Sequence, residues 1–474
     1  MSLNYRSRNC WEVYASPKER RAMQELAERY IDFLSRCKTE RETFLYVQDR
    51  LAKAGFTENM KSSKVMRGLY GKTIFAAKKG KLPLAQGMHI IGAHMDSPRL
   101  DLKQRPLLEQ AGVAQAKTHY YGGILKYQWL ARPLAIHGVI VKQDGTVVAV
   151  ELGEKPSEPV FTIADLLPHL AKDQAEKTLA KAFEGEKLNL LFGHEPLSAR
   201  ESAVARGKSS KTAKESSGCA CEPIKNRVLQ LLNDKYGIIE EDLYSAELQA
   251  VPAGPARFVG LDSALIGGYG QDDRICVFCT LEAFLNEGRS IASHSQCIIF
   301  WDKEEIGSEG ATGAKSRFFE YCIQELLASW ETRTKISDVM LASKAISADV
   351  HGAIDPDWQE LHEKLNAATI GHGPTFCKFT GHRGKYEAND AHPEYISWLR
   401  ALLNKQNIPW QMAELGRVDG GGGSTVAMYL ASYGMNIIDC GPSLLSMHSP
   451  FEIASKADLY ATTQVYNAFL KTLT

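Results

Sequence analysis

Three segments in the second half of the chain decide its fold: CIIFWDKEE at residues 297–305, SRFFEYCIQELLASW at 316–330 and VMLASKAISADV at 339–350. The first and third contain short apolar runs typical of buried strands, and the second has the length and apolar spacing of a helix. The alternation continues in PEYISWLRALLNKQ at 393–406 and MNIIDCG at 435–441. Such alternation predicts a doubly wound α/β fold, in which helices cover both faces of a mostly parallel sheet.

A segment of different character interrupts this α/β pattern. Residues 17–55 predict two amphipathic helices, and GMHIIGAHMDS at 87–97 contains a strand. From about residue 105 the chain becomes β-rich, and LAIHGVIVKQDGTVVAVEL at 134–152 predicts a hairpin with Asp-Gly at its turn. The Ser- and Lys-rich stretch at 199–218 predicts a long exposed loop. We therefore expect one α/β domain, residues 1–104 and 251–474, with a β-rich domain, residues 105–250, inserted into it.

Charge and composition exclude several classes of protein. Lys plus Arg equals Asp plus Glu at 56 each, so neither nucleic acid nor an anionic membrane is an expected partner. Neither a membrane-spanning run nor a signal-like N-terminus is present, so we expect a cytoplasmic protein. Ten scattered cysteines indicate reduced, buried thiols. Cys276 and Cys279 form a C-x-x-C pair, but Cys219 and Cys221 have the wrong spacing to complete a structural zinc site.

Side chains able to bind a metal follow five apolar, strand-like runs. They are His94 and Asp96 in MHIIGAHMDS, Asp272 and Asp273 in ALIGGYGQDDR, Glu304 and Glu305 in CIIFWDKEEIGS, Asp349 in ASKAISADVHG, and His448 in NIIDCGPSLLSMHSP. Ligands of open α/β sheets bind beyond the carboxyl ends of the strands. Each residue alone is more often a turn, capping or solvated residue. Together they predict a site for Zn²⁺, or for Mn²⁺ or Co²⁺.

The spacing within two of these segments suggests a division of roles. Residues two apart on an extended chain project to the same side, so Asp96 is placed to receive the second ring N–H of His94 and fix its tautomer. Of the adjacent Glu304 and Glu305, one can bind metal while the other stays free to take a proton from the attacking water.

These segments resemble a known family of metallopeptidases. HMDSPRLDLK, YGQDDR, DKEEIGSEGATGA, SADVHGAIDP and MHSPFE are similar to the signature segments of the aspartyl aminopeptidase family, the eighteenth metallopeptidase family. The stretches KFTGHRGK and GGGGST resemble its bacterial branch, which is similar to vacuolar-type aminopeptidases. The resemblance runs from about residue 15 to the C-terminus. It implies a zinc-peptidase α/β domain whose inserted domain serves oligomerisation.

The resemblance also implies a role for each candidate residue. One zinc ion is expected at His94, Asp272 and Asp349, and a second at Asp272, Glu305 and His448, with Asp272 as the bridge. Glu304 is expected to be the general base and Asp96 the orienter of His94. The choice of Asp272 over Asp273 rests on the family pattern alone. His169, in FTIADLLPHLAKD, matches a family histidine that reaches a neighbouring subunit's active site, although by itself it resembles an ordinary surface helix residue.

The function implied is removal of the first residue from short peptides. The substrate's free α-amine explains the restriction to one residue. The family assembles as a tetrahedral homo-dodecamer with an inner chamber. The alternatives are a related zinc hydrolase of another amide, a non-catalytic assembly protein on a peptidase fold, and a nucleotide-binding protein using Gly420–Gly423, a run that lacks the Lys of a P-loop. Arg383 and Lys385 are candidates to meet a substrate carboxylate or to form an exposed basic loop, which leaves the N-terminal residue preference open.

Overall fold

The computed structural model describes residues 3–197, 222–286, 291–423 and 425–472. The chain divides into two compact units: a first unit formed by Met1–Ser97 with Pro255–Thr474, and an inserted unit formed by Pro98–Gly254. The predicted boundaries at 104 and 251 differ from these by a few residues, because β4 (Arg99–Gln110) and β10 (Ala246–Pro252) pair with each other within the inserted unit. The polar stretch at 199–218 lies outside the described residues.

The first unit is built around a mixed sheet, which has eight strands among the described residues. In spatial order they are β1 (Lys64–Leu69), β2 (Thr73–Lys78), β13 (Ser295–Trp301), β3 (Met88–His94), β14 (Lys344–Ser347), β20 (Asn436–Gly441), β16 (Thr375–Cys377) and β18 (Gln411–Met412). The four central strands, β13, β3, β14 and β20, are mutually parallel. Strands β1, β2 and β16 join in antiparallel pairs. The mostly parallel α/β sheet predicted from the sequence is therefore confirmed.

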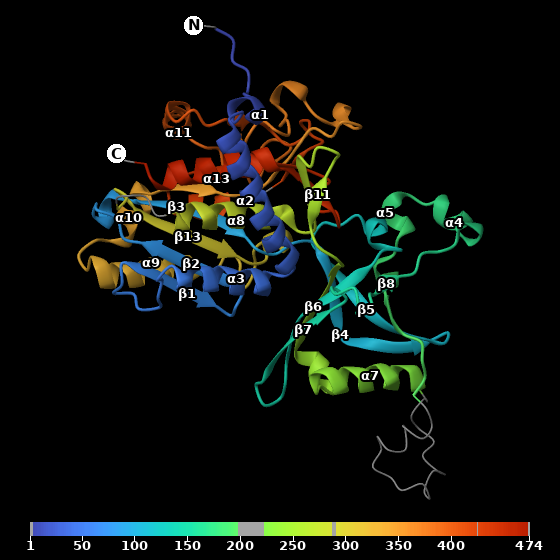
Figure 1. Ribbon diagram of the computed structural model, residues 1–474. Helices are drawn as coiled ribbons and strands as arrows, with labels where there is room; N and C mark the ends of the chain where they lie inside the picture. Colours follow the sequence, from blue (N-terminus) through green and yellow to red (C-terminus); the bar gives the residue numbers. More distant parts are fainter. Residues whose placement is uncertain (1–2, 198–221, 287–290, 424, 473–474) are drawn as a thin grey trace, which may run out of the picture. The chain divides into compact units, whose positions relative to one another are not determined.

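Helices cover both faces of this sheet, because neighbouring residues of each strand point to opposite sides. Ile91, Ile298 and Ile438 belong to one hydrophobic cluster. Their neighbours in the same strands, Ile90, Ile299 and Ile437, belong to a second cluster on the opposite face. The first cluster is completed by α2 (Pro17–Arg36), α3 (Glu40–Lys53), α8 (Gln271–Leu285), α11 (Pro393–Lys405) and α13 (Lys456–Leu470). The second is completed by α9 (Phe318–Trp330), α10 (Ile336–Ala342) and α12 (Ala427–Ala431) (Figure 1).

The two helices predicted over residues 17–55 are confirmed as α2 and α3, and the short helix α1 (Cys10–Val13) precedes them. Ser16 and Glu19 form a capping box at the start of α2, and Thr39 and Glu42 form one at the start of α3. Each box supplies acceptors to backbone N–H groups that have no partner within the first turn. The sequence therefore fixes where each helix begins.

Two smaller sheets of the first unit carry loops that matter for the candidate site. One has the order β11 (Arg257–Val259), β12 (Leu265–Gly268), β22 (Glu452–Ser455), β21 (Ser443–Leu445) and β15 (His351–Gly352). Strand β12 leads into α8, and His448 lies in the connection between β21 and β22. The other pairs β17 (Gly381–His382) with β19 (Gly422–Gly423). Single 3₁₀ turns occur at η1 (Leu84–Gln86), η6 (Glu304–Ile306), η7 (Gln359–Leu361) and η8 (Lys364–Asn366).

The inserted unit contains an antiparallel sheet, in agreement with its predicted β-rich character. In spatial order its described strands are β7 (Val147–Leu152), β6 (Leu134–Val141), β10, β4, β5 (Val113–Tyr121), β9 (Leu190–Gly193) and β8 (Thr162–Ile163). Strands β6 and β7 form the predicted hairpin, with Val141 opposite Val147. Its described helices are η2 (Lys126–Trp129), η3 (Pro168–Leu170), α4 (Lys172–Ala175), α5 (Leu179–Ala182), η4 (Gly185–Lys187), α7 (Pro223–Tyr236) and η5 (Glu240–Ser245).

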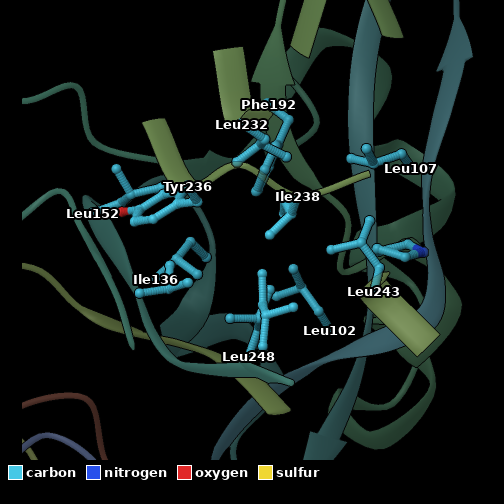
Figure 2. Close-up of a pocket in the computed structure, with 13 residues that line it drawn as sticks. Leu102, Leu107, Ile136, Leu152, Phe192, Leu232, Tyr236, Ile238, Leu243 and Leu248 are labelled. Atoms are coloured by element: carbon cyan, nitrogen blue, oxygen red, sulfur yellow. The ribbon is translucent and has the colours of Figure 1, made fainter. Parts of the chain in front are cut away.

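Helix α7 and the 3₁₀ turn η5 supply apolar side chains to the core of the inserted unit. Figure 2 shows Leu232 and Tyr236 of α7 around a small pocket with Ile136 of β6 and Leu248 of β10. The pocket lining is apolar throughout apart from the tyrosine hydroxyl. The packing of this core needs no ligand to explain it. Among the described helices of the whole chain, none is long and apolar enough to cross a membrane.

Candidate metal centre

The candidate ligands come together because their strands are neighbours. His94 is the last residue of β3, the 3₁₀ turn η6 with Glu304 and Glu305 follows β13, and Asp349 follows β14. These three strands are adjacent and parallel, so their carboxyl ends lie at one edge of the sheet. Asp272 reaches the same edge from the non-helical start of α8, and His448 reaches it from the connection between β21 and β22.

Asp272 stands at the centre of the cluster. Its Oδ1 lies 3.3 Å from His94 Nε2, and its Oδ2 lies 3.2 Å from His448 Nε2. Asp349 Oδ1 is 4.0 Å from His94 Nε2, and Glu305 Oε2 is 3.5 Å from His448 Nε2. One aspartate therefore faces two imidazoles with different oxygens, and each imidazole has a further carboxylate beside it.

Two sets of three possible ligands follow from this geometry. His94, Asp272 and Asp349 form one set, and Asp272, Glu305 and His448 form the other, with the ligand atoms of each set within 4.8 Å of one another. A third possible set, His94, Glu304 and Glu305, satisfies the same limit. Among the described residues, neither His169 nor any cysteine belongs to such a set. All five residues predicted to bind metal are thus brought together, and the C-x-x-C pair is not part of a comparable group.

The cluster holds more buried carboxylates than cationic side chains. Burial, and then the nearby Asp272, raise the pKa of Glu305, and burial followed by Asp273 raises the pKa of Asp349. Burial opposes protonation of His448, but Asp272 and Glu305 outweigh it and raise its pKa to about 10. Glu305 Oε1 is buried without a hydrogen-bond partner. A buried group of like charges is unfavourable unless cations neutralise it, and the imidazole and carboxylate donors suit zinc.

Asp96 contacts His94 but also has a second task. His94 Nδ1 lies 3.0 Å from the backbone oxygen of Asp96 and 3.3 Å from its carboxylate Oδ1. The backbone oxygen is thus the nearer acceptor, whereas the sequence predicted the carboxylate. The two carboxylate oxygens accept the backbone N–H groups of Glu304, at 3.1 Å, and Glu305, at 3.2 Å. Asp96 therefore links β3 to the turn that carries both glutamates.

Asp272 and Asp273, which the sequence could not distinguish, have different surroundings. Asp272 faces the histidines, whereas Asp273 Oδ2 accepts the backbone N–H of His94 at 3.3 Å. Asp273 is completely buried, and burial raises its pKa. It supports the end of β3 and enters none of the possible ligand sets among the described residues.

Two residues near the ligands were missed by the sequence analysis. Ser97 Oγ donates to the backbone oxygen of Asp272 at 2.7 Å. Glu452, four residues after His448 in the segment MHSPFE, is buried and accepts the backbone N–H groups of both His448 and Asp272. The one sequence feature that pointed to Glu452 is its place in MHSPFE, a segment already selected because it contains His448.

His169 and the basic loop lie elsewhere. His169 belongs to η3 of the inserted unit and is exposed, as are Leu167 and Leu170 beside it. Lys385 pairs with Asp390 at 3.2 Å and lies over the ring of Phe379. Arg383 is exposed and lines a surface pocket with Arg417 and the Gly421–Gly422 backbone. Contact of Arg383 or Lys385 with a substrate stays a prediction.

Known proteins share both the sequence and the fold of this chain. The model of the peptidase M18 family, described as aminopeptidase I zinc metalloprotease, matches residues 33–470. A probable M18 family aminopeptidase 1 of Clostridium acetobutylicum is 46% identical over 98% of both chains. The crystal structure of aminopeptidase I from the same organism has a TM-score of 0.90 at 42% identity, covering 99% of this chain and 100% of that one.

A more distant structure, the Saccharomyces cerevisiae mApe1 dodecamer, shares the fold with a TM-score of 0.75 at 21% identity, over 95% of this chain and 97% of that one.

The fold and site define a metallopeptidase of the zinc aminopeptidase class. The chain belongs to the peptidase M18 family, which confirms the family predicted from its sequence.

Proposed function

We propose that this chain is a two-zinc aminopeptidase that removes the first residue of short peptides. The observation that carries the proposal is Asp272, whose two oxygens lie 3.3 and 3.2 Å from the ring nitrogens of two different histidines. A carboxylate shared in this way suits a pair of ions better than a single ion. We assign one ion to His94, Asp272 and Asp349, and the other to Asp272, Glu305 and His448. The same donors also accept Mn²⁺ or Co²⁺.

When bound, such a pair of ions polarises the scissile carbonyl and increases the acidity of the attacking water. The protein's own contribution is the general base, to which we assign Glu304. Burial raises the pKa of Glu304 to about 7 despite the opposing effect of His94, which suits a group that accepts and returns a proton near neutral pH. Asp96 fixes the backbone of Glu304 and Glu305 together, so that one can act as base while the other binds metal.

The competing assignment makes Glu304 itself a ligand, in the set with His94 and Glu305. Matched variants separate the two. If Glu304 is the base, Glu304→Gln keeps both ions and loses turnover, whereas Glu305→Gln loses one ion. If Glu304 is a ligand, Glu304→Gln loses an ion instead. Metal content per chain, measured by elemental analysis after gel filtration, decides between them.

The carboxylates that surround the site also account for removal of a single residue. Acidic side chains gather around His94 and Asp272, among them Glu304, Glu305 and Asp349, and a peptide's α-ammonium group is the one cation that every unblocked peptide carries at its N-terminus. These carboxylates would orient the N-terminus by charge and hydrogen bonding. An N-acetylated peptide lacks that charge, so it should not be a substrate.

We further propose that the inserted unit assembles the enzyme into a homo-oligomer, a tetrahedral dodecamer, and brings His169 to a neighbour's site. Support comes from the exposed leucines beside His169 and from the dodecameric yeast structure of the same fold. A histidine N–H supplied by a partner could donate to the developing oxyanion. Assembly around a chamber would restrict substrates to short peptides.

The described cysteines are free and mostly deep in the cores, which suits the cytoplasm.

A panel of aminoacyl p-nitroanilides tests the function, with the matching N-acetyl compounds as controls. We expect cleavage of the free-amine compounds only, loss of activity after zinc chelation, and recovery on zinc addition. Preferential cleavage of the N-acyl compounds would instead identify a hydrolase of another amide. The same panel gives the N-terminal residue preference, acidic or apolar. If purified oligomer bound zinc but cleaved none of these amides, a non-catalytic assembly role would be favoured.

A further inference from the structure

Glu452 connects two loops that come from distant parts of the sequence. It is the first residue of β22, is buried with 1% exposure, and lies opposite Gly268 of β12. Its Oε2 accepts the backbone N–H groups of Gln271, at 2.5 Å, and Asp272, at 3.2 Å. Its Oε1 accepts the backbone N–H of His448 at 2.8 Å. One carboxylate thus joins the start of α8 to the connection between β21 and β22.

Both loops have backbone conformations that leave these N–H groups without a regular partner. Asp272 has φ −78° and ψ 106°, which breaks the start of α8, and His448 has φ 64°, in the left-handed region. Left-handed backbone is unfavourable for residues other than glycine unless surrounding contacts hold it. Buried backbone N–H groups also need an acceptor. The Glu452 carboxylate supplies that acceptor to Gln271, Asp272 and His448 at once.

The side chain of Gln271 holds Glu452 from the other direction. Gln271 Nε2 donates to the backbone oxygen of Glu452 at 2.6 Å, and Tyr30 of α2 donates to Gln271 Oε1 at 3.2 Å. Gln271 and Tyr30 are fully buried. The backbone of Glu452 is therefore held as well as its carboxylate, and by side chains that are themselves buried.

We propose that Glu452 is a positioning residue of the metal centre: by binding the backbone of both Asp272 and His448, it sets the separation of a shared carboxylate and an imidazole ligand. This rests on the proposed metal site. Asp272 Oδ2 and His448 Nε2 lie 3.2 Å apart, and the backbones of both residues are joined through the two oxygens of one side chain. Among the described residues, Glu452 enters no possible ligand set itself, so it acts through the other two.

Glu452 and Asp96 have similar roles, because each carboxylate holds the backbone of two site residues. Asp96 binds the backbone N–H groups of Glu304 and Glu305, and Glu452 binds those of Asp272 and His448. Asp96 uses one oxygen for each of two neighbouring residues of a single turn, whereas Glu452 uses one oxygen for the start of α8 and the other for His448. Loss of the Glu452 carboxylate should therefore weaken chiefly the ion assigned to Asp272, Glu305 and His448.

Glu452→Gln is the test variant, because the amide has the same size but offers an NH₂ group where one loop needs an acceptor. Asp458→Asn is the matched control. Asp458 is also fully buried, and its two oxygens accept the backbone N–H groups of Gly371 and Gly373, but neither glycine is a proposed ligand. Both variants remove one buried carboxylate oxygen that accepts a backbone N–H. Only the first does so beside proposed ligands.

Zinc affinity is measured by titrating the zinc-free full-length protein in competition with a chromogenic chelator. We expect Glu452→Gln to bind one of the two ions about 10- to 100-fold more weakly than the wild type, as removal of an outer hydrogen-bond partner of a ligand does. Excess zinc should restore turnover. Asp458→Asn should bind both ions as the wild type does. Equal affinities in Glu452→Gln and the wild type, or an equal loss in Asp458→Asn, would overturn the proposal.

Glu452→Asp covers the case in which Glu452→Gln does not fold. It keeps the buried negative charge but shortens its reach by one methylene, so one ion should again bind more weakly while the fold is retained. Unchanged zinc affinity in this variant would refute the positioning role. A wild-type protein that binds no zinc would instead refute the proposed function, so the two failures are distinguishable.

Discussion

Gly441 is the position where a single methyl group should disturb the metal centre most directly. It ends β20, and a Cβ added there would lie 2.1 Å from the backbone oxygen of Asp349 and 2.9 Å from Cys276 Sγ. Ordinary contact begins at 3.4 Å, so the first distance is short by about 1.3 Å. The obstructing atom belongs to the backbone and cannot rotate away. In Gly441→Ala the Asp349 backbone must therefore move by about 1 Å.

A displacement of that size should affect both stability and catalysis. Forcing a methyl group into a packed core costs roughly 1–3 kcal/mol. A misplacement of about 1 Å near reacting groups lowers turnover by roughly a hundredfold. Asp349 Oδ1 is already 4.0 Å from His94 Nε2, so the ion assigned to His94, Asp272 and Asp349 should bind more weakly. The assays are zinc titration of the zinc-free protein and kcat/KM on an aminoacyl p-nitroanilide.

Gly80→Ala is the matched control. A Cβ at Gly80 would lie 2.4 Å from the carbonyl carbon of His294 and 2.5 Å from the backbone nitrogen of Ser295, which is again an obstruction by backbone. Ser295 starts β13, so this contact is at the opposite end of the strand from Glu304 and Glu305. The control should lose stability but keep its zinc affinity. Normal zinc binding and turnover in Gly441→Ala would refute the close approach of β20 to Asp349.

Three further predictions follow from the site and its surroundings. Glu304→Gln should keep about two zinc ions and lose at least about a hundredfold in turnover, whereas near-normal turnover would move the base elsewhere. His169→Phe should lower turnover but not zinc content. Mixing this variant with Glu304→Gln under subunit exchange should restore some activity. If no activity returns despite proven exchange, His169 is an ordinary surface residue. Burial raises the pKa of Asp439 from 3.8 to about 6, so the folded state binds this proton more tightly than the unfolded state. The free energy of unfolding of the zinc-free wild type, relative to that of Asp439→Asn, should therefore fall by about 3 kcal/mol as the pH rises from about 4 to about 6. Urea unfolding measures both free energies. A difference that does not change with pH would contradict this prediction.

The parallel core of the first unit was predictable because its strands are continuous apolar runs. Ile298 and Ile299 of β13, and Ile437 and Ile438 of β20, are buried on opposite faces, which is the pattern of a strand between two helix layers. The hairpin at 134–152 was predictable from its Asp-Gly turn. Local sequence decides both features, so a single sequence sufficed.

Features that depend on distant contacts were not predictable. Nothing local distinguishes Asp272 from Asp273, because the direction of each side chain follows from the non-helical backbone at the start of α8. The role of Glu452 requires the pairing of β12 with β22, nearly 200 residues apart in the chain. Strands as short as β15 and β21 carry too little pattern to be recognised alone. The candidate ligands could be named, but the hydrogen bonds that hold them could not.

Anomalous X-ray diffraction at the zinc edge, from crystals of the zinc-loaded protein, shows whether two zinc ions share Asp272. We expect two peaks per chain, one among His94, Asp272 and Asp349 and one among Asp272, Glu305 and His448. Glu304 should lie outside both coordination spheres. A single peak, or a peak coordinated by Glu304, would contradict this expectation.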